Sequence, residues 1–346
     1  MNDIRSMYMD ELKELIVSLG EKPFRAGQLF SWLHEKHVES YDEMTNISSS
    51  FRSSLAEKYP LTTLREVQCL VSKRDGTRKY LFALDDGNVI ESVLMRYHHG
   101  NSVCISSQAG CNMGCAFCAS TIGGKVRDLR ASEMLEQVYA IQRSTGERVS
   151  NIVVMGTGEP FDNYDNLIRF IRLAGDEKGL NISVRNITVS TCGIVPRMYE
   201  LADEGLPVTL AVSLHAPNDE KRRRIMPIAK KYSIDEVVKA AKNYYKVTGR
   251  RVTFEYALTA GQNDSLEDAQ ELSDLLRGFP CHVNLIPVNP VKERDFVPPR
   301  AADTAKFQNR LEKNRINVTI RKKMGGDING ACGQLRKSYT DLKDSK

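Results

Sequence analysis

Hydrophobic positions recur with two different periods along the chain, and the change of period divides it into regions. Over residues 1 to about 70 they recur at helical spacing, as at Leu12 and Ile16, which predicts a small N-terminal helical domain. Two alternating runs then flank a turn at 85–87. This pattern predicts a β-hairpin extension over 71–100.

A repeat of apolar strand and amphipathic helix follows from residue 101 to about 325. Such alternation indicates parallel strands whose outer face is covered by helices. The number of repeats predicts an α/β fold, namely a partial, open TIM-like barrel of the (βα)6 type, followed by a C-terminal segment at 326–346. The predicted strands lie at 103–107, 151–155, 186–191, 208–214, 252–258, 282–287 and 316–321.

Unusual residues follow the carboxyl ends of these predicted strands, where parallel α/β folds collect their chemistry. A cysteine-rich loop follows the first strand, and a segment containing Gly158 and Glu159 follows the second. Later strands are followed by Ser190, by Ser213, Leu214 and His215, and by Asn289. Glycines alone would indicate only a turn, and a lone histidine is more often structural. Together, however, these segments predict an active site at this edge of the barrel.

One carboxylate interrupts the apolar face of the second hairpin strand, because Glu91 lies between Val89 and Val93. Such a residue is either a charge that faces water from an edge strand or a carboxylate directed into a cavity. Periodicity does not choose between these interpretations.

The composition is ordinary for a globular protein, with 41% apolar residues, 27% charged residues and a net charge of +5. No apolar run approaches the roughly 20 residues that cross a bilayer, and the N-terminus lacks the pattern of a signal peptide. We therefore expect a cytoplasmic protein whose cysteines stay reduced. Basic runs such as 221–224 are usually solvated faces, but several of them favour a polyanionic partner.

The most specific signal is the loop at 110–120, in which Cys111, Cys115 and Cys118 have C-x3-C-x2-C spacing. Thiolates bind zinc or iron–sulfur clusters. A structural zinc needs four ligands, and the remaining nearby candidate, Cys104, lies within a predicted strand. Three sulfurs from one tight loop would leave one iron of a cubane open to chelate a substrate. The spacing therefore favours a 4Fe-4S cluster over zinc.

These motifs resemble those of the RlmN/Cfr family of radical S-adenosylmethionine (SAM) RNA methyltransferases. The resemblance extends over nearly the whole chain and includes KPFRAGQLFSWL, CISSQAGCNMGCAFCASTIGG, MGTGEPFDN, VSLHAPND, HVNLIPVN and GGDINGACGQLR. It implies a 4Fe-4S cluster held by Cys111, Cys115 and Cys118, whose open iron binds SAM, with two SAM molecules used per turnover. It also implies methylation at C2 of adenine 2503 in 23S ribosomal RNA and of adenine 37 in some transfer RNAs.

The resemblance further implies roles for individual residues at matching positions. Cys332 would carry the methyl group, and Cys104 would resolve a covalent RNA intermediate through a transient disulfide with Cys332. Glu91 would be a proton acceptor. The positions that would contact SAM are Gly158, Glu159, Ser190, Ser213, Leu214, His215 and Asn289.

Other interpretations stay open at this point. One is Cfr-like methylation of C8, another is a zinc-stabilised RNA-binding module without catalysis, and a third is a radical SAM enzyme acting on a small molecule or peptide. The third gives Cys332 no purpose. The expected partners are 23S ribosomal RNA, free or in an assembly intermediate, transfer RNA and a flavodoxin-type reductant. We expect a monomer without a membrane partner.

Overall fold

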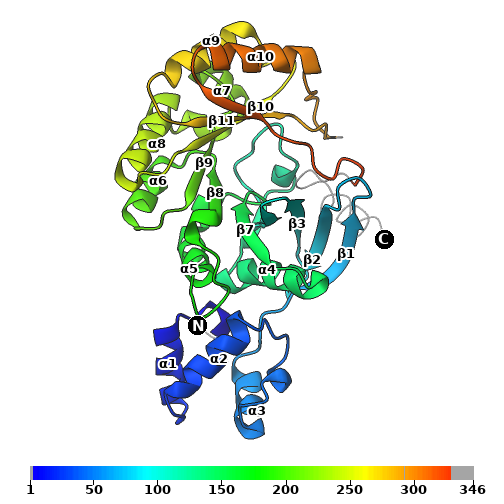
Figure 1. The fold of residues 1–346 in the computed structure, drawn as a ribbon, viewed down its shortest axis with the longest axis vertical. Coiled ribbons are helices and arrows are strands. Elements are labelled where there is room, and N and C mark those ends of the chain that lie inside the picture. The colour runs from blue at the N-terminus through cyan, green and yellow to red at the C-terminus, as the bar shows by residue number, and fades with distance from the viewer. Residues whose placement is uncertain (1–2, 292, 329–346) are drawn as a thin grey trace.

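The computed structural model describes residues 3–291 and 293–328. It consists of a curved sheet with helices on its outer side and a helical lobe at one end of the longest axis (Figure 1). None of the described helices is long and apolar enough to cross a membrane. The lobe contains η1 (Ile4–Ser6), α1 (Met9–Ser18), α2 (Phe24–His34), η2 (Tyr41–Glu43) and α3 (Ser49–Lys58).

The antiparallel end of the sheet contains β1 (Arg65–Val71), β2 (Arg78–Ala83) and β3 (Val89–Tyr97). Strands β2 and β3 are the predicted hairpin. The prediction of helix to about residue 70 was wrong at its end, because residues 65–71 pair with β2 as a strand. None of the seven side chains of β1 is fully buried. An edge strand of this kind leaves little hydrophobic alternation in the sequence.

Seven parallel strands, among the residues that the structure describes, continue the sheet from β3 in chain order. The strands are β4 (Gly100–Cys104), β7 (Val149–Val154), β8 (Ile187–Thr191), β9 (Thr209–Ser213), β10 (Thr253–Leu258), β11 (His282–Pro287) and β12 (Asn317–Ile320). The helices between them are α4 (Ala131–Thr145), α5 (Tyr164–Ala174), α6 (Val195–Asp203), α7 (Asp219–Ile225), α8 (Ile234–Thr248), α9 (Leu266–Leu275) and α10 (Ala301–Lys313). Because β1 and β12 are the two edges of the sheet, the barrel stays open. The prediction of an open (βα)6 barrel is confirmed.

Alternate residues of the parallel strands have opposite environments. One set is apolar and buried under the helices, and it includes Val103, Ile152, Val189, Leu210, Val212, Phe254 and Val283. The other set faces the concave side, where register pairs Cys104 with Val93 and Val153, and Ser213 with Glu255. Since paired residues point to the same face of a sheet, the polar candidates share the concave face.

A small two-stranded sheet of β5 (Gln108–Gly110) and β6 (Lys125–Asp128) flanks the cysteine loop, and the sequence did not predict it. Short 3-10 turns complete the described elements: η3 (Ala119–Thr121), η4 (Pro160–Asn163), η5 (Val184–Asn186) and η6 (Pro227–Lys230). Because β5 and β6 are joined only to each other, they hold the loop as an arm beside the main sheet.

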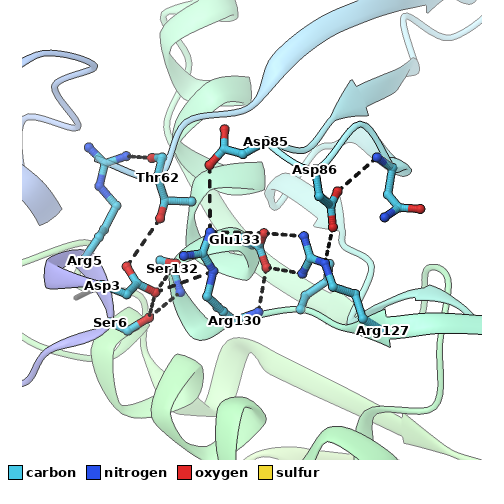
Figure 2. Close-up of polar contacts among 12 residues, drawn as sticks. Asp3, Arg5, Ser6, Thr62, Asp85, Asp86, Arg127, Arg130, Ser132 and Glu133 are labelled. Carbon is cyan, nitrogen blue, oxygen red and sulfur yellow. Dashed lines mark hydrogen bonds and ion pairs between the residues drawn. The ribbon is translucent and has the colours of Figure 1, made fainter. Parts of the chain in front are cut away.

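The N-terminal lobe is joined to the barrel by a buried polar network (Figure 2). The two parts also share a hydrophobic core. The Asp3 carboxylate accepts hydrogen bonds from Ser6 (2.7 Å) and from Ser132 at the start of α4 (2.6 Å). Arg5 forms an ion pair with Glu136 of α4 (2.5 Å) and donates to the carbonyl of Thr62 (2.7 Å). The lobe is therefore fixed at the amino end of α4.

The same helix end also fixes the hairpin (Figure 2). Arg127 of β6 donates two hydrogen bonds of 2.8 Å to Glu133 of α4 and forms an ion pair with Asp86 in the hairpin turn. The hairpin turn, about 40 residues earlier in the sequence, thus meets β6 and the start of α4 at one arginine.

Candidate active site

The cysteine loop lies on the segment that follows β9. The backbone N–H of Ala116 donates to the carbonyl of Ile225 at the end of α7 (2.8 Å). Cys115 is buried in a small apolar cluster with Cys192, Ile225 and Met226. The cysteine loop therefore packs against residues that lie about 100 positions away in the sequence.

The entry to the loop requires glycine at position 110. The backbone of Gly110 has a φ of +89°, and a Cβ atom there would lie 2.0 Å from the carbonyl oxygen of Gly124. That carbonyl accepts the N–H of Cys111 (3.1 Å), so the two ends of the loop are closed by a direct backbone contact. A larger residue at position 110 would open the loop that carries the cysteines.

The three cysteines of the motif lie close enough to influence one another's charge. Burial raises the pKa of the Cys111 and Cys115 thiols, and the charge of Cys118 raises the pKa of both further. Burial likewise raises the pKa of the Cys118 thiol. Thiols that the protein holds in the neutral form in this way lose their protons when a metal binds.

The spread of these thiols does not fit a single metal ion. Across residues 3–291 and 293–328, no three His, Cys, Asp or Glu side chains converge closely enough to hold one ion. Zn–S bonds of about 2.3 Å would bring the sulfurs of a zinc site close together.

Glu159 follows β7 and is almost completely buried (4% exposed). Its carboxylate accepts the backbone N–H groups of Cys192 (2.7 Å) and Phe161 (3.1 Å). Burial raises the pKa of Glu159, while these hydrogen bonds act in the opposite direction. The preceding Gly158 lies so close to the loop after β4 that a Cβ atom would be 2.7 Å from the Ser107 hydroxyl. The segment that contains Gly158 and Glu159 thus contacts the residues that follow β4 and β8, the two strands next to β7.

His215 follows β9 and contacts the cysteine loop directly. Its ring meets the ring of Phe117 edge to face, with centroids 4.9 Å apart. The N–H of Ala257 donates to Nδ1 (2.9 Å), which leaves the proton of the neutral ring on Nε2. Burial lowers the pKa of His215 to about 3. The side chain is therefore a neutral, fixed hydrogen-bond donor rather than an acid–base group at neutral pH.

The remaining cofactor candidates lie where the sequence placed them, at the carboxyl edge. Ser190 is at the end of β8 and Ser213 at the end of β9, and both are half-buried on the concave face. Asn289 is half-buried just after β11. Leu214 is fully buried and its N–H donates to the carbonyl of Glu255 (3.0 Å).

The hairpin supplies a buried charged group next to Cys104. Glu91 is 2% exposed on the central strand β3, so it does not face water. It forms an ion pair with the fully buried Lys79 of β2 (N–O 3.2 Å). Burial raises the pKa of the Cys104 thiol to about 11, and the positive charge of Arg321 acts against this rise. The interpretation of Glu91 as a charge that faces water from an edge strand is therefore wrong, and its direction into a cavity stays a prediction.

Comparisons with known proteins decide the family. A family model described as "Radical SAM superfamily" matches residues 105–276, and one described as "Ribosomal RNA large subunit methyltransferase N-terminal domain" matches residues 2–60. A relative from Lachnospira eligens, "Probable dual-specificity RNA methyltransferase RlmN", is 62% identical over 99% of this chain and 97% of its own length. This chain belongs to the RlmN family.

Two further matches agree with this membership. The RlmN relative from Clostridium perfringens is 51% identical over the full length of both chains. A crystal structure titled as a radical SAM methyltransferase from Sphaerobacter thermophilus is 43% identical, covers 96% of this chain and 98% of its own, and has a TM-score of 0.92. The cofactors of the radical SAM superfamily are a 4Fe-4S cluster and SAM.

The residues present fit this cofactor pair. Cys111, Cys115 and Cys118 are free thiols that come from one loop, and the glycine-rich turn at Glu159 and the ring of His215 lie next to it. Neutral and anionic hydrogen-bond partners therefore surround the place where a cluster would be held. Cys332 lies outside the described residues, and its place relative to Cys104 stays a prediction.

The structure removes one residue, Arg222, from the basic run 221–224 as a possible RNA surface, and RNA contact by the other residues stays a prediction. Arg222 is fully buried, Lys221 pairs with Asp268 (2.6 Å), and Arg223 and Arg224 pair with acidic residues one helical turn away. A run of four cations in the sequence thus becomes one buried and three paired side chains, because a helix points consecutive residues in different directions.

Sequence reasoning missed two residues of the site, Lys79 and Arg222. Lys79 belongs to an alternating strand, and the cross-strand pairing that brings it to Glu91 has no local signature. Arg222 is hidden inside the basic run. The sequence shows only that basic residues outnumber the neighbouring acidic residues in this segment. That excess does not indicate which basic side chain is buried.

Proposed function

We propose that this protein methylates C2 of an adenine in RNA, namely adenine 2503 of 23S ribosomal RNA and adenine 37 of some transfer RNAs. The observation that carries the proposal is the pair of Cys104 and Glu91, buried together on the concave face beside a loop with three free thiols. A plain binding module has no need of such a pair. Its family supports the choice of RNA as substrate.

The electronic structure of adenine explains why this reaction needs more than one cysteine. C2 carries no nucleophilic lone pair, so it cannot displace the methyl group of SAM directly. A carbon group must first be placed on the protein and then joined to C2. Cys332 is the thiol assigned to this task, and its thiolate would accept a methyl group from SAM by simple displacement.

Cys111, Cys115 and Cys118 would hold the cluster, and the open iron would bind SAM. When bound, the cluster supplies an electron whose transfer to SAM gives a species able to remove hydrogen from a methyl group. The residues that would position SAM are Gly158, Glu159, Ser190, Ser213, Leu214, His215 and Asn289. The neutral Nε2–H of His215 suits a neutral acceptor such as a ribose or adenine atom.

Release of the product would fall to Glu91 and Cys104. Addition of the carbon radical on Cys332 to C2 would tether the RNA as a radical adduct, which must lose one electron, back to the redox cofactor, and the proton on C2 to become a stable thioether. Glu91, paired with Lys79, would accept that proton. The thiolate of Cys104 would then attack the sulfur of Cys332, so that an S–S bond forms and the S–C bond breaks with its electron pair on the departing carbon, which takes up a proton to become the methyl group. The disulfide formed needs an external reductant.

Several partners follow from this chemistry. The substrate would be naked ribosomal RNA or an assembly intermediate, because the target base must be extruded to reach the concave face. A flavodoxin-type protein would supply electrons, and a reduced cytoplasm would keep the thiols ready. The N-terminal lobe (1–70), hairpin (71–100), barrel (101–325) and C-terminal segment (326–346) would act as one monomeric enzyme.

The direct test of the product is mass spectrometry of RNA digests. Ribosomal and transfer RNA from cells that lack the gene should contain no 2-methyladenosine, and expression of this protein should restore it in both. Appearance of 8-methyladenosine instead would establish Cfr-like chemistry. RNA without either product would refute the proposed function.

The roles of the two outlying cysteines are separated by a cross-linking experiment. Cys104→Ala protein should accumulate as a cross-link to RNA through one carbon on Cys332, and the link should survive denaturation and thiol reductants because a thioether is not a disulfide. Cys332→Ala protein should give no cross-link. A free Cys104→Ala enzyme that still methylates RNA, or a cross-link mapped to another residue, would contradict the assignment.

A further inference from the structure

The side chain of Arg222 on α7 is completely buried beside the cysteine loop. Its Nη2 donates to the carbonyls of Cys192 (2.7 Å) and Ser213 (3.3 Å), and its Nε donates to that of Leu214 (3.2 Å). These bonds join α7 to the ends of β8 and β9. The guanidinium thus lies at the edge of the sheet where the cofactor candidates are gathered.

The charge of Arg222 is not compensated by the protein. All three acceptors are neutral carbonyls, and in the described part of the chain no carboxylate lies within ion-pair distance of it. Asp219, on the same helix, pairs instead with Arg223 (3.7 Å) and accepts the N–H of Ile234 (2.9 Å). The buried Nη1 atom also has no hydrogen-bond partner. A buried ion without a counter-ion is strongly unfavourable, so one is to be expected nearby.

The groups next to this charge are those that support the cysteine loop. Arg222 donates to the carbonyl of Cys192 (2.7 Å), and Cys192 packs against Cys115 in the same buried cluster. Other charges act on the same loop: Glu159 lies near Cys115, and Arg294 lies near Cys118. Glu159 is negative, and Arg294 is only half-buried, so water screens its charge. Of the two arginines that lie near the cysteine loop, Arg222 is therefore the one that is fully buried.

We propose that Arg222 is the counter-ion of the iron–sulfur cluster and sets the potential at which the cluster accepts its electron. The net charge of a cluster held by three thiolates becomes more negative on reduction. A buried positive charge stabilises the reduced form more than the oxidised form, and cluster potentials depend on net charge and on hydrogen bonds to the sulfurs. This inference rests on ligation by Cys111, Cys115 and Cys118, but not on any particular RNA product.

The test is a redox titration of the reconstituted full chain without RNA or SAM, followed by electron paramagnetic resonance. Arg222→Gln keeps a hydrogen-bond donor and removes the charge. At a fixed ambient potential, it should lower the ratio of reduced to oxidised cluster at least tenfold, which is about 59 mV for one electron. Arg222→Lys keeps the charge and should show less than half of that shift. The matched control is Arg223→Gln, on the same helix but 53% exposed, which should show none.

Each other outcome overturns the proposal. An unchanged potential in Arg222→Gln would show that the charge does not reach the cluster, and equal shifts in the Gln and Lys variants would show that only the carbonyl bonds matter. If Arg222→Gln does not retain iron, Arg222→Lys decides: normal iron and potential support the proposal, and loss of iron refutes it. An unchanged potential together with weaker binding of radiolabelled SAM would assign the guanidinium to the carboxylate of SAM instead.

The result is independent of the proposed reaction. Failure of the reaction would appear as absent 2-methyladenosine with a normal potential. Failure of the ligand assignment would appear in a separate variant, Cys115→Ser, as protein that retains its iron.

Discussion

Two arginines among the described residues are completely buried, Arg5 at the junction of lobe and barrel and Arg222 beside the cysteine loop. Arg5 pairs with Glu136, which is also fully buried (2.5 Å). Arg222 has carbonyl partners and no ion pair among the described residues. Each arginine keeps one buried nitrogen without a partner, Nε of Arg5 and Nη1 of Arg222. The two sites therefore differ in charge balance and not in the number of unused donors.

This difference separates a structural from a functional use of the same side chain. At the junction the chain provides both charges, so the pair is complete once the protein is folded. Beside the cysteine loop the buried Arg222 has no ion-pair partner among the described residues, and the three thiols become anionic when metal binds. The second charge balance thus depends on a cofactor. Substitutions at the junction and at the cysteine loop test this difference in charge balance.

The largest effect should come from the cysteines. Replacing Cys115 with Ser should remove essentially all iron, because a cluster with only two thiolate ligands is not retained. Cys104→Ala is the matched control, since Cys104 is equally buried (8% against 9% exposed) but lies on β4 outside the loop. We expect it to keep iron and the visible absorption of the cluster. Equal loss from both variants would favour four thiolate ligands and leave Arg222 without its proposed partner.

Breaking the Arg5 pair should have the next largest effect. Arg5→Met leaves the buried Glu136 with Arg143 as its remaining ion-pair partner, so the variant should lose about 3 kcal/mol of folding free energy, the lower end of the range for a broken buried pair. Urea unfolding followed by the fluorescence of Trp32, the single tryptophan, reports on the lobe directly. The double variant Arg5→Met/Glu136→Leu should recover at least half of the loss. No recovery would mean that Arg5 acts through its carbonyl bonds, as Arg222 does.

Acid should weaken the junction through a buried histidine. Burial lowers the pKa of His34 from 6.5 to about 3. Below pH 6.5 His34 is therefore protonated in the unfolded chain but stays neutral in the folded protein. The free energy of unfolding falls as the pH decreases from about 6.5 toward 3. The slope should be about 1.4 kcal/mol per pH unit for this group. His34→Gln should flatten the dependence by that amount, as seen by the Trp32 signal. An unchanged slope would assign it to other groups.

The smallest effect should come from the exposed end of α7. Arg224 is 64% exposed and pairs with Glu220 on the same helix. Arg224→Gln should change stability by less than about 0.5 kcal/mol and leave the cluster potential unchanged. If Arg223 and Arg224 also contact RNA, neutralising both should reduce the slope of log affinity against log salt by up to about 2 units. An unchanged slope would place the RNA path elsewhere.

Local pattern was sufficient for much of this protein. All seven parallel strands were predicted because apolar strands and amphipathic helices leave a periodic signal within about 20 residues. The cysteine motif and the strand-end segments at Glu159 and His215 were also visible, because their spacing reflects the chemistry that they serve. The open barrel follows from the number of repeats.

Only the tertiary structure decided which charges are buried and how they are balanced. Nothing near Glu91 in the sequence indicates Lys79, since their contact comes from pairing of β2 with β3. Nothing in a run of four basic residues indicates that Arg222 lies in the interior. Charge balance depends on distances between segments far apart in sequence and on exclusion of water, and neither quantity is written in a local pattern.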